Sequence, residues 1–236
     1  MKCTLFINML CIVLGKQKKI IMKEYMSTHI YKPKTINQQK YLTAIDNDEH
    51  KLIIVHGPAG TGKTLFACVN AIEYLKNNVV EKIVLTRPVV SVEEEIGYLP
   101  GNINQKMDPW TRPLFDIFLE YYKKPDIDRM IDNQIIEIIP LGYMRGRTFK
   151  NSYIIADEMQ NSTPNQFKMI TTRLGDNSRM VITGDLKQSD LRENNGLTDF
   201  LDRSKFKNLN EISIIKLDQN DVERSNIVKT VLGIYE

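Results

Sequence analysis

The chain has 236 residues, of which 42% are hydrophobic and 26% are charged, as is ordinary for a soluble globular protein. This length allows one good hydrophobic core or two small ones. The formal net charge of +3 is concentrated in residues 1–25, where five lysines accompany one glutamate, so the remainder carries 3 − 4 = −1 and overall basicity supports no claim about a nucleic-acid partner.

The first 25 residues are predicted to form a tail outside a main domain at residues 26–236. An apolar run at 3–14 precedes a lysine cluster and is about a dozen residues long, short of the roughly 18–20 that span a bilayer. No small-residue cleavage site follows, so we expect no stable membrane insertion. Three interpretations stay open: a non-native extension from an early start codon, which Met22 and Met26 favour, a membrane-surface tail, or an element packed on the domain.

The cysteine pattern favours a reducing compartment. Three cysteines have neither disulfide-framework nor metal-ligand spacing: Cys3, Cys11 and Cys68. We therefore expect a cytoplasmic protein.

Residues 35–45 predict a short helix with Tyr41, Leu42 and Ile45 facing inward. Gln38 or Gln39 lies about a dozen residues ahead of the first predicted strand, where a side-chain amide could hydrogen-bond the edge of an adenine. The alternative is a solvated helix face, which is the usual place for glutamine. We take Gln38 as the candidate nucleotide ligand.

A glycine-rich stretch at 57–64 lies between a predicted strand at 51–55 and a predicted helix at 65–76. It fits the phosphate-binding pattern G-x-x-x-x-G-K-[ST] at every constrained position. A strand, such a turn and a helix N-terminus together aim backbone N–H groups at an anion. All eight residues are candidate nucleotide ligands: Gly57, Pro58, Ala59, Gly60, Thr61, Gly62, Lys63 and Thr64.

Two side chains of this loop have distinct expected roles. Lys63 would reach the β- and γ-phosphates, and the hydroxyl of Thr64 would ligate Mg²⁺. The three glycines would let the backbone approach phosphate oxygens where a Cβ would interfere. The loop predicts a protein that binds a nucleoside triphosphate.

A long insert separates a predicted second strand at 82–86 from a third at 135–139. Inserts of this kind in α/β domains more often carry function than fold. It contains an amphipathic helix predicted around Trp110 to Tyr122, whose main use would be to bury an apolar face. Three of its side chains could instead stack on bases: Trp110, Arg112 and Phe115.

Two arginines flank a glycine in the loop after the third strand. Arg145 and Arg147 are candidate phosphate ligands, because a guanidinium is always charged and binds phosphate in a bidentate manner. They could hold nucleotide or a nucleic-acid backbone, or be surface charges.

A fourth predicted strand, at 152–156, ends in two acids. Asp157, at the carboxyl end of a buried strand, would hold Mg²⁺ together with Thr64. Glu158 could polarise the attacking water, because consecutive residues at a strand end point apart and serve different partners.

A helix is predicted to begin at Thr163–Pro164 and to end at Gly175, before a fifth strand at 179–183. Gln188 follows that strand and is a candidate sensor of the γ-phosphate.

The last strand is predicted at 212–217 and a final helix at about 221–235. Arg224 would lie in the first turn of that helix, where a cation gains nothing from the helix dipole. The position favours a functional role such as an arginine finger.

These motifs resemble those of the PhoH-like proteins, single-domain ATPases related to the core of superfamily-one helicases. The resemblance covers roughly residues 34–236. It rests on seven segments: GPAGTGKT at 57–64, TRPVV at 86–90, EEEIGYLPG at 93–101, MRGRTF at 144–149, ADEMQN at 156–161, TGDLKQSDL at 183–191 and DVERSNIV at 221–228.

The resemblance implies an α/β fold, a three-layer RecA-like domain whose central sheet is mainly parallel and binds ATP at the strand ends. It implies that Glu158 is the glutamate beside the metal aspartate and that Gln188 lies near the γ-phosphate. It also implies a homo-oligomeric ring, with a hexamer expected, in which Arg224 acts on a neighbour's ATP.

Two departures accompany the resemblance. The family usually has a histidine after that arginine, and this chain has Ser225. No RNA-binding or nuclease domain is added to the core, so any nucleic acid would engage the core itself. The composition, rich in lysine, asparagine and isoleucine, and the compact form are similar to phage- or virus-encoded members.

The leading functional hypothesis is a cytoplasmic, Mg²⁺-dependent ATPase that couples hydrolysis to RNA or single-stranded DNA, in the manner of a helicase. Unwinding would need a neighbouring subunit as the second lobe. The alternative is an ATP-dependent switch that controls a protein partner without remodelling nucleic acid. A small-molecule kinase is a third class, but the Glu158 and Gln188 pair argues against it because a kinase should exclude water.

Overall fold

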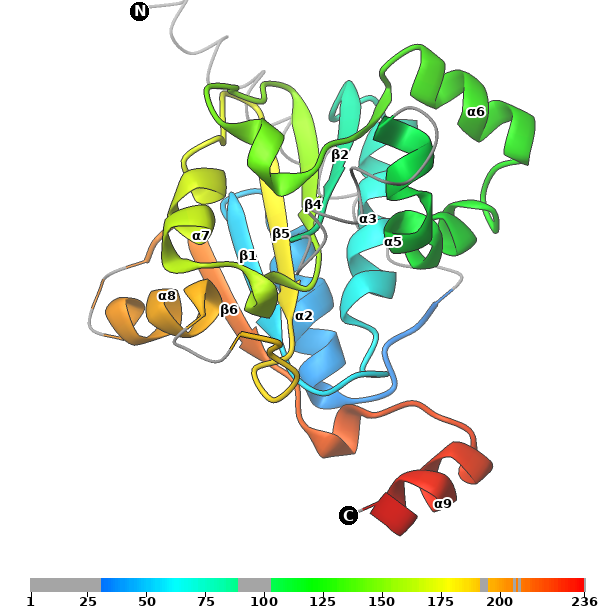
Figure 1. Cartoon of the computed structure of the whole chain (residues 1–236), viewed down its shortest axis with the longest axis vertical. Helices are drawn as coiled ribbons and strands as arrows, with labels where there is room; N and C mark the ends of the chain where they lie inside the picture. Colours follow the sequence, from blue (N-terminus) through cyan, green and yellow to red (C-terminus); the bar gives the residue numbers. More distant parts are fainter. Residues whose placement is uncertain (1–30, 89–102, 192–194, 206, 208, 236) are drawn as a thin grey trace, which may run out of the picture. The chain divides into compact units, whose positions relative to one another are not determined.

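The computed structural model describes residues 31–88, 103–191, 195–205, 207 and 209–235 (Figure 1). The predicted tail at 1–25, the motif at 93–101, the last two residues of the TRPVV motif and Arg192 lie outside these ranges. The described residues from Pro33 onward belong to one compact unit.

The core of this unit is a sheet of six parallel strands in the order β3-β2-β4-β5-β1-β6. The strands are β1 (Leu52–His56), β2 (Lys82–Thr86), β3 (Ile136–Ile138), β4 (Ser152–Ala156), β5 (Arg179–Gly184) and β6 (Ile212–Lys216). The central strands read as continuous apolar runs because both faces of the sheet are covered.

Helices cover the sheet on two sides, with α2, α3 and α5 on one face and α7 and α8 on the other (Figure 1). The described helices are α2 (Ile36–Asp46), α3 (Lys63–Lys76), α5 (Ile103–Phe118), α6 (Lys124–Asp132), α7 (Pro164–Thr171), α8 (Gly196–Ser204) and α9 (Asn226–Tyr235), with 3-10 turns η1 (Leu141–Met144), η2 (Met159–Asn161) and η3 (Gln219–Asp221). The predicted fold class, a three-layer RecA-like α/β domain around a parallel sheet, is confirmed.

The insert and the C-terminus differ most from the prediction. Helix α5 begins at Ile103 rather than near Trp110 and ends at Phe118 rather than near Tyr122. Its described part buries Leu114 and Phe118 while Arg112 is exposed, which agrees with the interpretation of a packed apolar face. Helix α6 was not predicted. None of the helices among the described residues is long and apolar enough to cross a membrane.

A buried arginine organises the amino-terminal edge of the sheet. The guanidinium of Arg179, the first residue of β5, donates to the carbonyls of Asn47 at 2.6 Å and His50 at 3.0 Å. It also donates to the carbonyl of Ile45 and the hydroxyl of Tyr74, and lies 4.7 Å from the centre of the Tyr74 ring. These contacts satisfy a charge that would otherwise be costly to bury, and they tie α2, α3 and the entry to β1 to the central sheet.

We predict that Arg179→Met lowers the free energy of unfolding by about 3 kcal/mol, because it leaves several buried carbonyl groups without a donor. Arg203→Met is the matched control, since Arg203 is exposed and pairs only with Asp199 on its own helix. The control should change stability by less than about 1 kcal/mol. Urea denaturation of both variants tests this, and equal losses would contradict the assigned role of Arg179.

Candidate active site

The glycine-rich loop joins β1 to α3 at the carboxyl edge of the sheet, as predicted. Its first N–H, on Gly57, donates to the carbonyl of Gly184 at the end of β5. A Cβ on Gly57 would lie 2.4 Å from the carbonyl oxygen of Leu217, just beyond β6. Glycine is therefore required here by the protein's own backbone, before any phosphate is considered. Gly62 is the N-cap of α3 and has no side chain to cap the first N–H groups, which suits an anion site.

Lys63 begins α3, and its ammonium group is folded back onto the loop. Nζ donates to the carbonyls of Gly57 and Pro58, both at 2.8 Å. Burial lowers the pKa of Lys63 and the nearby charge of Arg224 lowers it further, while Asp185, Glu158 and Asp157 oppose the shift. The loop thus holds a partly desolvated cation that a phosphate group would stabilise.

Thr64 and Asp157 meet, as the sequence predicted for a metal site. The Thr64 hydroxyl donates to Oδ1 of Asp157 at 2.8 Å, and the Thr183 hydroxyl of β5 donates to the same oxygen at 2.5 Å. Thr86 lies next to this pair, because its carbonyl accepts from the N–H of Asp157. The buried hydroxyl of Thr86 has no hydrogen-bond partner among the described residues. Such an orphaned group is what a bound water would satisfy.

This donor set fits Mg²⁺. The described residues contain no cluster of three or more His, Cys, Asp or Glu side chains arranged for a metal. Mg²⁺ does not need one, because it commonly takes one or two protein oxygens and completes its shell with phosphate and water. Thr64 and Asp157 would supply those oxygens.

Glu158 follows Asp157 and has an unusual backbone. Its φ of +54° lies in the left-handed region, which glutamate seldom adopts, whereas three of the other four described non-glycine residues with positive φ are asparagines. Strain of this kind is often found at functional sites.

Gln160, for which no role was predicted, connects the two predicted catalytic segments. Its buried amide donates to Oε2 of Glu158 at 2.6 Å and to the carbonyl of Gln188 at 3.4 Å. Its amide oxygen accepts from the N–H of Asp185 at 3.0 Å. Gln160 therefore fixes the carboxylate of Glu158 and brings the loop with Gln188 beside it. Gln160 lies within the ADEMQN motif at 156–161, and its place in that motif was the one sequence feature that could have indicated a role.

Arg224 lies against the loop of its own chain. The N–H of the preceding Glu223 donates to the carbonyl of Gly60 at 2.9 Å, and Nε of Arg224 is 2.6 Å from where a Cβ on Gly60 would be. One expectation is corrected: Arg224 precedes α9 instead of lying in its first turn. Its side chain contacts the loop of its own chain, and an action on a neighbour's ATP stays a prediction.

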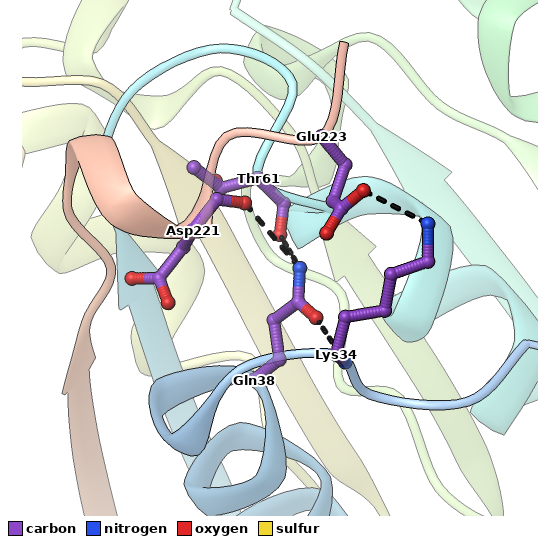
Figure 2. A network of polar contacts seen from close by, with 5 residues as sticks. All are labelled: Lys34, Gln38, Thr61, Asp221 and Glu223. Carbon is purple, nitrogen blue, oxygen red and sulfur yellow. Dashed lines mark hydrogen bonds and ion pairs between the residues drawn. The ribbon is translucent and has the colours of Figure 1, made fainter.

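Gln38 is buried, and its amide is used within the chain (Figure 2). Nε2 donates to the carbonyls of Thr61 at 3.3 Å and Asp221 at 3.4 Å, and Oε1 accepts from the N–H of Lys34 at 2.8 Å. The interpretation as a solvated helix face is wrong. An adenine contact stays a prediction, and it would have to compete with these partners.

Arg147 does not reach the loop. Its guanidinium pairs with Glu137 at 2.8 Å and stacks on Phe149. Glu137 is in β3, four strand positions from β1, which is roughly 19 Å across the sheet. In this structure Arg147 is therefore engaged away from the phosphate loop, and its role as a nucleotide or nucleic-acid ligand stays a prediction. Arg145 is exposed after η1, and its role stays a prediction.

The sequence profile described as PhoH-like protein matches residues 30–236 of the chain. A PhoH-like protein of Bacillus subtilis (strain 168) is 44% identical over 205 residues, which cover 86% of this chain and 63% of that protein. One of Synechocystis sp. is 39% identical over 230 residues, covering 94% and 69%. The chain thus spans about two thirds of the length of these relatives. Both are bacterial and lend no support to the predicted phage or viral origin.

Structural similarity is weaker. The SWI2/SNF2 ATPase core of Sulfolobus solfataricus, solved with double-stranded DNA, is 15% identical with a TM-score of 0.44, covering 82% of this chain and 47% of that one. A TM-score this low carries no functional conclusion.

We predict that Glu158→Gly raises the free energy of unfolding by about 1 kcal/mol, because glycine adopts the left-handed conformation without steric cost. Glu158→Gln keeps the Cβ and should bring no such gain. Thermal unfolding of the two variants measures the difference. If Glu158→Gly is no more stable than Glu158→Gln, the backbone at this position is not strained.

Proposed function

The chain belongs to the PhoH-like protein family, and we propose that it is a Mg²⁺-dependent ATPase that couples hydrolysis to RNA or single-stranded DNA. The observation that carries the proposal is the 2.8 Å hydrogen bond from the Thr64 hydroxyl to Oδ1 of Asp157, next to the buried Lys63. Together these groups form a phosphate and metal site with a second carboxylate, Glu158, adjacent to it.

Each side chain has a proposed task in hydrolysis. Glu158 orients a water and accepts its proton as the oxygen attacks the γ-phosphorus, while the bond to the leaving ADP oxygen breaks. Lys63 and Arg224 stabilise the negative charge on the transferring phosphoryl group. Mg²⁺, held by Thr64 and Asp157, would supply further charge neutralisation. Gln160 fixes Glu158, and Gln188 senses the γ-phosphate.

In this proposal Arg224 acts on the nucleotide bound by its own chain, because it already lies over Gly60. A homo-oligomeric ring, with a hexamer expected, remains part of the proposal on the family resemblance. The neighbouring subunit would then serve as the second lobe without having to supply the arginine.

A cavity of about 540 Å³ beside the phosphate loop is the proposed contact for nucleic acid. Its lining includes His56 of β1, Lys205 and Lys207, together with several apolar side chains and with Asp202, which pairs with Lys205. Because His56 directly precedes the phosphate loop, a nucleic-acid backbone bound here would lie next to the ATP site.

A reducing cytoplasm, where ATP is available, remains the proposed location of the protein. The buried free thiol of Cys68 agrees with that location.

We predict ATP hydrolysis that requires Mg²⁺ and is stimulated by single-stranded RNA or DNA. Glu158→Gln should lower kcat by about 10²- to 10⁴-fold, since the amide cannot take the proton. Glu49→Gln is the matched control. Glu49 is exposed and precedes the amino end of β1, whereas the phosphate loop follows the carboxyl end, so this variant should hydrolyse ATP at the wild-type rate. A slow rate indifferent to nucleic acid, with a protein partner bound only in the ATP state, would instead favour the switch.

We also predict that Arg224→Ala lowers kcat by about 10³-fold while ATP binding persists. Mixing this variant with Lys63→Ala separates the two possible geometries. If Arg224 serves its own chain, no mixed oligomer contains a complete site and the mixture stays inactive. Recovery of activity on mixing would show that the arginine acts on a neighbour.

A further inference from the structure

The segment that carries Arg224 is fastened to β1 just before it begins and to the phosphate loop near its end. We call residues 218–224, between β6 and α9, the strap. Just before it, the N–H of Leu217 donates to the carbonyl of His56 at 2.8 Å, which extends the β6–β1 pairing. Near its other end, the N–H of Glu223 donates to the carbonyl of Gly60 at 2.9 Å. The strap therefore crosses the loop and leaves Arg224 above it.

A buried carboxylate anchors the middle of the strap to α2. Asp221 is 1% exposed, and it accepts from the Thr35 hydroxyl, from Nδ2 of Asn37 at 3.0 Å and from the N–H of Asp218 at 2.7 Å. Burial alone would raise the pKa of Asp221, but these hydrogen bonds outweigh it and hold the pKa below its usual value. Thr35 is also the N-cap of α2, accepting from the N–H of Gln38, so one hydroxyl serves the helix and the strap.

Gln38 joins the strap to the loop from the same end of α2 (Figure 2). Its amide nitrogen bridges the carbonyl of Asp221 in the strap and that of Thr61 in the loop. On the surface, Lys34 pairs with Glu223 at 2.8 Å. The amino-terminal end of α2 and the residues just before it thus hold the loop and the strap together. The last of these contacts is at Glu223, the residue before Arg224.

The strap does little to anchor the element that follows it. Helix α9 leaves Ile227 68% and Ile234 73% exposed, so it is not a core element of this unit. Arg224 itself is exposed and has a flexible side chain whose ordering is costly. A polar network that fixes the backbone on the amino-terminal side of Arg224 lowers that cost by preorganising the guanidinium.

We propose that Asp221, Thr35 and Gln38 are positioning residues that hold Arg224 over the phosphate loop of its own chain. This inference rests on the proposed ATPase function. They need not touch the nucleotide; they act on the transferring phosphate through the placement of Arg224.

The test combines kinetics with hydrogen exchange on the full chain. Asp221→Asn and Thr35→Val should each lower kcat by up to about hundredfold, with KM for ATP little changed, because misplacing a charge by about 1 Å has that effect. The strap peptide containing Glu223 should exchange faster in both variants, while peptides from β1 and β4 keep their protection. In an Asp221→Asn/Arg224→Ala double variant, kcat should be no lower than in Arg224→Ala alone.

Two further variants separate positioning from folding. Thr35→Ser keeps the hydroxyl and should restore both kcat and slow exchange. Thr43→Val is the matched control on the same helix, because the Thr43 hydroxyl is exposed and bonds only the carbonyl of Gln39; it should behave as wild type. Unchanged kcat or unchanged exchange at the strap in Asp221→Asn would overturn the proposal, as would additive losses in the double variant. A wild-type protein without ATPase activity would overturn the proposed function, and exchange would still decide whether the network holds the strap.

Discussion

The hydrogen bond from Thr64 to Asp157 joins two residues 93 positions apart, and the site depends on the sheet that brings them together. Thr64 is positioned by β1 and Asp157 by β4, and β5 lies between these strands. Because all three strands run in parallel, their carboxyl ends lie at one edge. The intervening strand contributes Thr183, whose hydroxyl helps to satisfy the same buried carboxylate. A different strand order would separate the groups even if every local motif were retained.

Features encoded within a few residues could be predicted from the sequence. The phosphate loop is such a feature, because strand, turn and helix follow one another without interruption. Asp157 was predicted by a similar argument, since the end of a buried apolar strand is recognisable locally. The metal pair then followed from the arrangement of P-loop NTPases, in which the loop threonine and an acid after a buried strand hold Mg²⁺ together. The role of Glu158 came from its place beside Asp157 and from the family resemblance, whereas its left-handed backbone gave no sequence signal.

Partners distant in sequence could not be predicted. Arg147 is a residue type that often binds phosphate, but its guanidinium pairs with Glu137 of β3, the edge strand farther from the phosphate loop. Gln38 had two interpretations, a nucleotide ligand or a solvated residue, and neither predicted that its amide nitrogen donates to the carbonyls of Thr61 and Asp221. The helical pattern from 221 onward misplaced Arg224, because a capping box between Asp218 and Asp221 closes a separate short turn first. The chain then stays extended while Glu223 bonds to Gly60, and α9 begins only at Asn226.

The two edges of the sheet differ in how well their charges are satisfied. At the amino edge, the buried guanidinium of Arg179 donates hydrogen bonds to four acceptors, which compensate the cost of burying its charge. At the carboxyl edge, the ammonium of Lys63 donates to two backbone carbonyls, yet burial still lowers its pKa, and Glu158 has a left-handed backbone. In the proposed function, an anionic triphosphate at this edge would offset the cost of burying the Lys63 charge. The well-satisfied opposite edge helps the fold to tolerate that cost.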